Sequence, residues 1–369
     1  MNKLLSQLRI DYDHWLNQSE RIASLDYWRA IAILLVLFVH FFEGPHRLGY
    51  LGVQIFFVLS GFLVSKGLIA DVFGKSKIRI WSFYKRRFIR ILPSYYCFLI
   101  VGSFIASFAA RDPGSVMIRN DDWWSFVFFF KNYNFTNPSA FGHLWSLCVE
   151  EHFYLTLPLV ILLSVSIGIP RVMLMPVAAG ILLLPTLLRL VTHLMIDRGY
   201  PPSLTDPAAT HNNLDAFIVG LFLRLLIERK LQFGRYSRAL LFVIAISVLA
   251  ISTYCAARGG NFFYSAIFAR LVDSVAIASL VYCTIGFRRR WLAPLQVLAF
   301  YSFNVYLWHL SAKYLVRDWF KADFISFTGY VFTSLFLACV FTHLVELVPY
   351  RFNERRLRRE REEPARRAS

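Results

Sequence analysis

The sequence predicts an all-α protein that crosses a membrane many times, a bundle of about ten transmembrane helices. Of its 369 residues, 57% are hydrophobic and only 17% are charged, and the mean hydropathy is +0.50. A water-soluble chain cannot bury that much apolar surface, which excludes a pair of soluble domains. The five cysteines show no paired spacing, which excludes a disulfide scaffold.

Each span is predicted from a run of residues with few charges. The length of each run is close to the roughly 20 residues that a helix needs to cross the hydrocarbon core. Some of these runs contain charged residues, which usually turn toward the interior of a helix bundle. In chain order, the predicted spans cover residues 25–43, 48–65, 91–110, 152–170, 172–195, 214–227, 239–257, 264–287, 291–312 and 324–345.

The basic residues between the spans predict the orientation. With a cytoplasmic amino terminus, the cytoplasmic side holds 26 basic residues and the opposite side holds 9. The positive-inside rule therefore predicts that both termini are cytoplasmic. The net charge of +17 is explained by this asymmetry, and we expect no nucleic-acid partner. The cytoplasmic count covers residues 1–24, 71–90, 171, 229–238, 288–290 and 351–369.

The chain divides into a membrane domain, residues 25–350, and two flanking segments. Residues 1–24 place apolar side chains on one helical stripe, which predicts an amphipathic helix on the cytoplasmic membrane surface. Their acidic residues argue against a cleavable targeting signal. Residues 351–369 predict a basic, solvated cytoplasmic tail able to touch anionic lipid.

The outward segment 111–144 is rich in aromatic residues set among Asp and Asn. One interpretation is an interfacial or re-entrant segment whose rings anchor at the level of the lipid headgroups. The other is a surface on which sugar rings stack at the mouth of a site. The two interpretations of this segment are compatible.

Arg29 and His40 predict a polar track through the first span. They are 11 residues apart, close to three helical turns, and so share one face at a separation of about 16 Å. A single intramembrane histidine is often only a packing hydrogen-bonder. The arginine on the same face favours a function.

Glu150 and Glu151 follow His143 near the outer end of the fourth span. Adjacent helical residues diverge by about 100°, so we expect only one carboxylate, Glu150, to face the cavity of His40. A carboxylate beside an imidazole orients it and raises its basicity, as general-base catalysis requires. The alternative is a buried ion pair that holds the helices in register.

Arg86 and Arg90 are spaced i, i+4 in a basic inward loop, where they predict a guanidinium fork suited to phosphate oxygens. Ordinary positive-inside anchoring explains most such loops. Together with the polar track, the fork predicts acyl transfer from coenzyme A. The phosphates would stay on the cytoplasmic arginines while the pantetheine arm follows the track to His40.

Five ordered motifs over about residues 24–350 resemble the membrane acyltransferase family 3. They are Leu25-Asp-Tyr-Trp-Arg29 with His40, Gly52-Val-Gln-Ile-Phe-Phe-Val-Leu-Ser-Gly-Phe62, Arg86-Arg-Phe-Ile-Arg-Ile-Leu-Pro93, His143-Leu-Trp-Ser-Leu-Cys-Val-Glu-Glu-His-Phe-Tyr154 and Tyr301-Ser-Phe-Asn-Val-Tyr-Leu-Trp-His309.

The resemblance implies a ten-helix enzyme of the bacterial inner membrane. Such an enzyme moves an acyl group, commonly acetyl from acetyl-CoA, onto a hydroxyl of a glycan or glycolipid such as O-antigen or exopolysaccharide. It implies that His40 is catalytic, that Arg29 lines the path, and that Arg86 and Arg90 bind the donor. Glu150 and Glu151 match a family signature, and His309 matches as a structural residue. We expect no additional hydrolase-like domain after the core.

His40 would act as a general base, or would carry the acyl group as a covalent intermediate. The sequence does not identify the group that donates hydrogen bonds to the oxyanion. The rival interpretations are a transporter or flippase for a lipid-linked sugar or small anion, and a glycan sensor, although no repeat between the halves favours transport. The histidines and cysteines lack ligand spacing, so we expect no metal.

Overall fold

The computed structural model describes residues 21–43, 46–74, 77–109, 118–119, 121–134, 140–196, 208–230, 233–257, 267–316 and 324–349. These residues form helices and connecting turns, with no β-strand among them. Most of the predicted amphipathic segment and the whole basic tail lie outside them. The chain is an all-α, multi-pass membrane protein, as the sequence predicts.

Each of the ten predicted spans coincides with a helix or a helix pair. Seven of the described helical segments are long and apolar enough to cross a membrane. The long helices are α2 (Ala23–Phe42), α3 (His46–Phe73), α4 (Ile80–Ala109), α7 (Trp145–Ser166), α8 (Leu174–Leu182), α9 (Leu184–Ile196), α11 (Leu214–Glu228), α12 (Arg235–Ala257), α13 (Ala269–Thr284), α14 (Ala293–Val316) and α15 (Phe324–Phe341).

Short helical turns connect or extend these helices. They are α6 (Trp123–Val127), η1 (Lys131–Tyr133), η2 (Gly142–Leu144), η3 (Arg171–Met173), η4 (Thr210–Asn212), η6 (Arg290–Leu292) and the π-helical turn η7 (Thr342–Glu346).

The predicted span 172–195 is broken, because α8 and α9 are separate helices that meet at Leu183. Pro185 lacks a backbone N–H and its ring crowds the carbonyl four residues earlier, which interrupts the helical hydrogen bonds there. α8 and α9 still form one segment long enough to cross a membrane.

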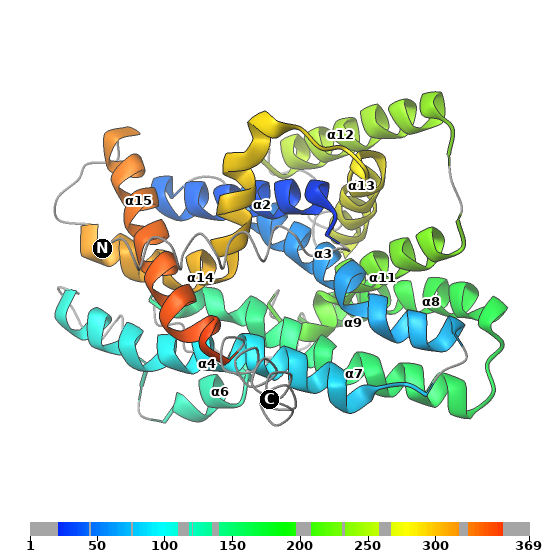
Figure 1. Ribbon diagram of the computed structural model, residues 1–369, viewed down its shortest axis with the longest axis horizontal. Coiled ribbons are helices and arrows are strands. Elements are labelled where there is room, and N and C mark those ends of the chain that lie inside the picture. Colours follow the sequence, from blue (N-terminus) through cyan, green and yellow to red (C-terminus); the bar gives the residue numbers. More distant parts are fainter. Residues whose placement is uncertain are drawn as a thin grey trace, which may run out of the picture.

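Helix α2 lies in the middle of the bundle (Figure 1) and packs against α3, α13, α14 and α15. Its apolar stripe, which includes Ile33, Val36 and Leu37, is fully buried. Arg29 and His40 stand on this helix, and both are half-buried.

Helices α3 and α11 cross closely at two glycines. A Cβ added to Gly61 would lie well inside van der Waals distance of the Phe217 carbonyl oxygen. A Cβ added to Gly220 would clash in the same way with the carbonyl oxygen of Val58. Small residues at helix contacts in membranes allow this backbone approach.

Charged residues within the predicted spans face the interior, as expected. Arg189 and Asp215 form an ion pair of 2.8 Å between α9 and α11, and both side chains are almost fully buried. Arg47 at the start of α3 forms an ion pair with the buried Asp273 of α13.

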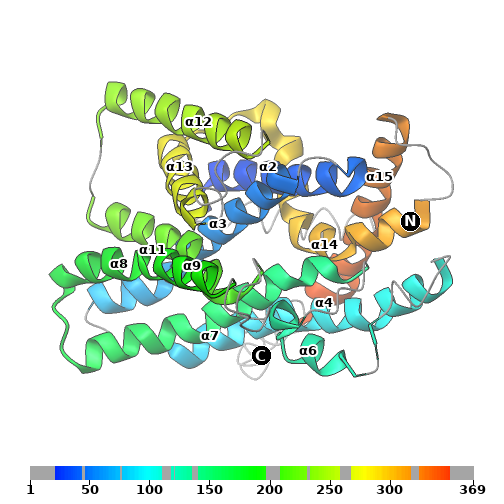
Figure 2. The same ribbon diagram turned by 180° about the vertical axis from the view of Figure 1, so that it is seen from behind.

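The described part of the aromatic segment packs beside α4 (Figure 2). The hydroxyl of Tyr95 donates to the carbonyl oxygen of Phe126 at 2.8 Å, and Tyr96 donates to Val127 at 2.9 Å. Trp124 and Phe128 remain exposed. These exposed rings suit either a lipid interface or a sugar, so both interpretations stay predictions.

Candidate active site

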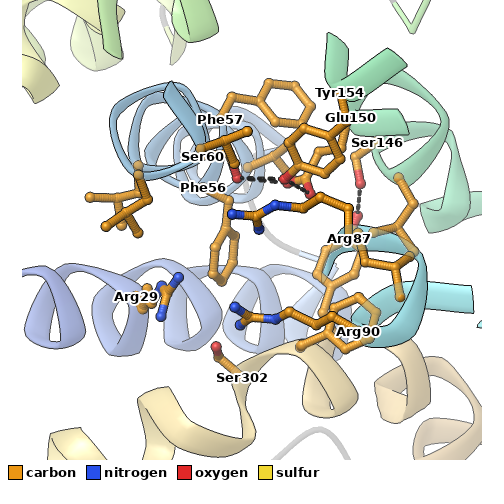
Figure 3. Close-up of a pocket in the computed structure, with 18 residues that line it drawn as sticks. Arg29, Phe56, Phe57, Ser60, Arg87, Arg90, Ser146, Glu150, Tyr154 and Ser302 are labelled. Carbon is orange, nitrogen blue, oxygen red and sulfur yellow. Dashed lines mark hydrogen bonds between the residues drawn. The ribbon is translucent and has the colours of Figure 1, made fainter. Parts of the chain in front are cut away.

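A pocket opens between α2, α3, α4, α7 and α14 (Figure 3), with a volume of about 770 Å³ that includes space open to solvent. Arg29, Arg87 and Arg90 line it together with the hydroxyl groups of Ser60, Ser146, Tyr154, Ser302 and Tyr306 and the carboxylate of Glu150. The surplus of guanidinium groups favours an anionic ligand.

Two of these guanidinium groups have no protein acceptor within the described residues. Arg87 and Arg90 extend from α4 into the pocket, and Arg29 lies opposite them on α2 (Figure 3). No described residue forms a hydrogen bond or an ion pair with Arg29 or Arg90. Their N–H donors are therefore available to a ligand.

The two members of the predicted fork, Arg86 and Arg90, have different surroundings. Arg86 is exposed and does not line the pocket, whereas Arg87 does. The reason is the buried face of α4, on which Phe83 and Ile91 stand one helical turn before and after Arg87. Following this apolar stripe through the basic cluster would have selected Arg87.

Glu150 faces the pocket but is engaged by hydroxyl groups. Its Oε2 accepts a hydrogen bond from Tyr154 at 2.8 Å, and its Oε1 accepts one from Ser60 at 3.4 Å (Figure 3). Among the described residues, no hydrogen bond joins either of these oxygens to His40, and the pairing of Glu150 with His40 stays a prediction. The face of α7 that carries Glu150 meets α3.

Glu151 turns away, as expected for the neighbour of Glu150 on a helix. It is 4% exposed and is absent from the residues that line the pocket. Its Oε1 has no hydrogen-bond partner in the part of the chain that the structure describes. The geometry gives Glu151 no direct role in the pocket.

His40 belongs to a cluster of three imidazole rings, His40, His143 and His309, which we call the imidazole cluster. The ring of His309 lies 4.8 Å from that of His40 and 4.8 Å from that of His143, centroid to centroid. None of the three lines the pocket. No role of His143 was predicted from the sequence, because only the tertiary packing of α2, η2 and α14 brings the rings together.

Tyr306 connects the pocket to the imidazole cluster. It lines the pocket, and its ring lies 5.4 Å from that of His143 and 5.6 Å from that of His309. The molecule thus places a pocket lined by arginines on one side of Tyr306 and the imidazole cluster on the other. Such an arrangement suits transfer of a group from a phosphate-bearing donor.

Comparison with known proteins agrees with this geometry. Residues 22–343 match the family model described as acyltransferase domain. YrhL of Bacillus subtilis is 27% identical over 364 residues, which cover 91% of this chain and 55% of YrhL.

Two further relatives carry an activity in their names. The peptidoglycan O-acetyltransferase OatA of Listeria monocytogenes is 26% identical over 316 residues, covering 78% of this chain and 49% of that protein. The O-acetyltransferase OatA of Staphylococcus aureus is 26% identical over 365 residues, covering 92% of this chain and 57% of that protein.

The chain spans about half the length of the curated relatives it matches. No solved structure matches it. The family model covers most of the chain, including every residue of the pocket and of the imidazole cluster. The protein therefore belongs to acyltransferase family 3, as its motifs predict.

Proposed function

We propose that this protein is a membrane O-acetyltransferase, which moves an acetyl group from acetyl-CoA to a hydroxyl of a glycan on the far side of the membrane. One observation carries the proposal. The guanidinium groups of Arg29 and Arg90 face a pocket and have no acceptor among the described residues.

Acyl-CoA fits this pocket by its charge. Its phosphates are acceptors that guanidinium groups bind with short, charge-assisted hydrogen bonds. Arg29 and His40 stand about 16 Å apart along α2, a distance that suits the extended pantetheine arm. The thioester would then lie near the imidazole cluster while the nucleotide stays with the arginines.

His40 suits the role of general base. Its Nδ1 lies 2.9 Å from the carbonyl oxygen of Val36, which can only accept, so Nδ1 carries the proton. The Nε2 of the neutral ring therefore holds the lone pair that takes a proton from the attacking hydroxyl. A covalent acyl-imidazole on the same nitrogen is the other route.

The acceptor we propose is a polysaccharide of the cell envelope. Two relatives are named for O-acetyl transfer, one of them to peptidoglycan. The excess of basic residues supports cytoplasmic termini and a place in the bacterial inner membrane, with the donor pocket facing the cytoplasm. Acetyl-CoA would enter from the cytoplasm, and the glycan from outside.

The test is reconstitution of the full chain in liposomes with acetyl-labelled acetyl-CoA. Peptidoglycan strands and lipid-linked glycans are supplied in separate reactions, and label on the glycan is measured. Transfer is expected from the native protein and not from His40→Ala. His193→Ala on α9, outside the pocket and the cluster, is the matched control. Movement of unlabelled glycan across the bilayer without acetyl transfer would instead support a transporter.

A further inference from the structure

We propose that the hydroxyl groups of Tyr306 and Ser146 stabilise the oxyanion that forms on the acetyl carbonyl during transfer. The inference rests on the proposed acetyl transfer and adds the group that this chemistry requires. Attack on a thioester places negative charge on the carbonyl oxygen, and preorganised donors at that point lower the barrier.

The two hydroxyls form one buried unit at the wall of the pocket. Tyr306 Oη and Ser146 Oγ are 2.5 Å apart, and the residues are 7% and 4% exposed. Tyr306 also donates to the backbone carbonyl oxygen of His143 at 2.8 Å. Both residues line the pocket that holds the free guanidinium groups.

The helices place this hydroxyl pair one turn from the imidazole cluster. On α14, Tyr306 precedes His309 by three residues, and Ser146 follows His143 by three residues where η2 leads into α7. A separation of three residues corresponds to a rise of about 4.5 Å. The hydroxyl pair therefore borders the pocket, and the rings of His143 and His309 lie behind it.

A donor that reaches from the arginines toward His40 meets this pair. Tyr306 contacts both His143 and His309, and His309 contacts His40. The acetyl carbonyl at the tip of the pantetheine arm would come within reach of Tyr306 and Ser146 just before the carbon reaches the attacking hydroxyl.

Other groups near this point are poor oxyanion donors. The Nε2 of His143 lies 3.1 Å from the carbonyl oxygen of Leu307, and the Nδ1 of His309 lies 2.7 Å from that of Tyr306. Carbonyl oxygens only accept, so these nitrogens carry the protons of the neutral rings. A ring N–H points in a fixed direction, whereas a hydroxyl proton can rotate from one acceptor to another. The remaining nitrogens of the two rings hold lone pairs, which would repel an oxyanion.

The charged residues of the pocket are also unsuited to donate hydrogen bonds to the oxyanion. Arg29 is separated from His40 by about three helical turns, too far to reach the acetyl carbonyl, and would bind the phosphates of the donor instead. Glu150 is an acceptor for Tyr154 and Ser60, not a donor. The hydroxyl group of Tyr306, which contacts the imidazole cluster, and that of its hydrogen-bond partner Ser146 are therefore left as the oxyanion donors.

The chemical step balances without another reactant. His40 Nε2 takes the proton of the glycan hydroxyl as its oxygen bonds to the acetyl carbon, and the carbonyl electrons move to the oxyanion. The Tyr306 O–H turns from the carbonyl oxygen of His143 to this oxyanion, and Ser146 donates beside it. Collapse breaks the C–S bond, and the imidazolium of His40 returns the proton to the thiolate.

The test compares Tyr306→Phe and Ser146→Ala in the reconstituted full chain. Each is expected to lower kcat about 100-fold or more, as for loss of one oxyanion donor, with little change in the KM for acetyl-CoA. A second measurement is binding of trifluoroacetonyl-coenzyme A, whose hydrated ketone is tetrahedral. Both variants should weaken its binding by a similar factor and leave binding of free coenzyme A unchanged.

Tyr301→Phe on the same helix is the matched control, because its hydroxyl contacts His343 and lies outside the pocket. The inference is overturned if the native protein transfers acetyl and both variants keep its kcat, or if the tetrahedral analogue and free coenzyme A lose affinity together. If Tyr306→Phe does not fold, the kcat of Ser146→Ala and its binding of the tetrahedral analogue test the inference. Absence of transfer by the native protein overturns the proposed function, and this inference with it.

Discussion

The ring of His309 packs against the ring of His40, with centroids 4.8 Å apart and ring planes at 72°. His309 is fully buried, and its Nδ1 donates to the carbonyl oxygen of Tyr306 at 2.7 Å. A ring held by its own helix in this way restricts how the neighbouring imidazole can turn. We therefore expect His309 to help position His40.

Replacing His309 by Ala is therefore expected to lower kcat for acetyl transfer by roughly 10- to 100-fold, because misplacement of a catalytic group by about 1 Å costs that much. The KM for acetyl-CoA should change little, since the arginines are untouched. Steady-state kinetics on the reconstituted protein check this, and the fall should be smaller than for His40→Ala. A rise in KM with constant kcat would assign His309 to donor binding instead.

Glu150→Gln separates two roles for this carboxylate. If Glu150 only organises Ser60 and Tyr154, the variant should keep kcat within about 3-fold, since an amide oxygen still accepts a hydrogen bond. Loss of a negative charge beside the arginines should also lower the KM for the polyanionic donor. If turnover instead fell by about 100-fold or more, the role predicted from the sequence, a carboxylate that orients His40 and raises its basicity, would be supported.

Arg90→Ala and Arg86→Ala form a matched pair, with the same charge removed from one helix. Arg90 faces the pocket and Arg86 is exposed. Loss of a charge-assisted hydrogen bond costs about 1.5–3 kcal/mol, so Arg90→Ala should weaken acetyl-CoA binding roughly 10- to 100-fold. Arg86→Ala should leave it almost unchanged. Equilibrium binding in detergent would show this, and equal losses in both variants would contradict the assignment of the pocket.

The sequence predicted the positions of the helices well, because long apolar runs are a local property. Helices α11, α13 and α14, which were also predicted as spans, are not among the seven segments long and apolar enough to cross a membrane. The break at Leu183 is a further exception. It follows from Pro185, whose missing N–H interrupts the helix. That residue was visible in the sequence.

The sequence predicted several residues of the site but few of the contacts between them. Arg29, Arg90 and Glu150 do meet in one pocket, since each stands on an inward face of its helix. The partners of His40 depend on how α2 and α14 rotate against each other, which no local pattern encodes. The contact between the rings of His40 and His309 could therefore not be predicted from the sequence.

The close crossing of α3 and α11 makes a sharp prediction about stability. Ala at Gly61 would push its Cβ into the backbone carbonyl of Phe217, which cannot move aside as a side chain can. Overpacking of this kind costs about 1–3 kcal/mol or more, so Gly61→Ala should lower the thermal unfolding midpoint in detergent. Gly220→Ala, which meets the carbonyl of Val58, should behave alike.

Gly180→Ala is the control, because an added Cβ there meets no atom within 4 Å. Gly180 lies inside α8, where Ala is favoured over Gly by about 0.5–1 kcal/mol, so this variant should hold or raise the midpoint. The two substitutions are chemically identical and should shift stability in opposite directions. If Gly61→Ala also held or raised the midpoint, the backbones of α3 and α11 would have to lie farther apart than the structure places them.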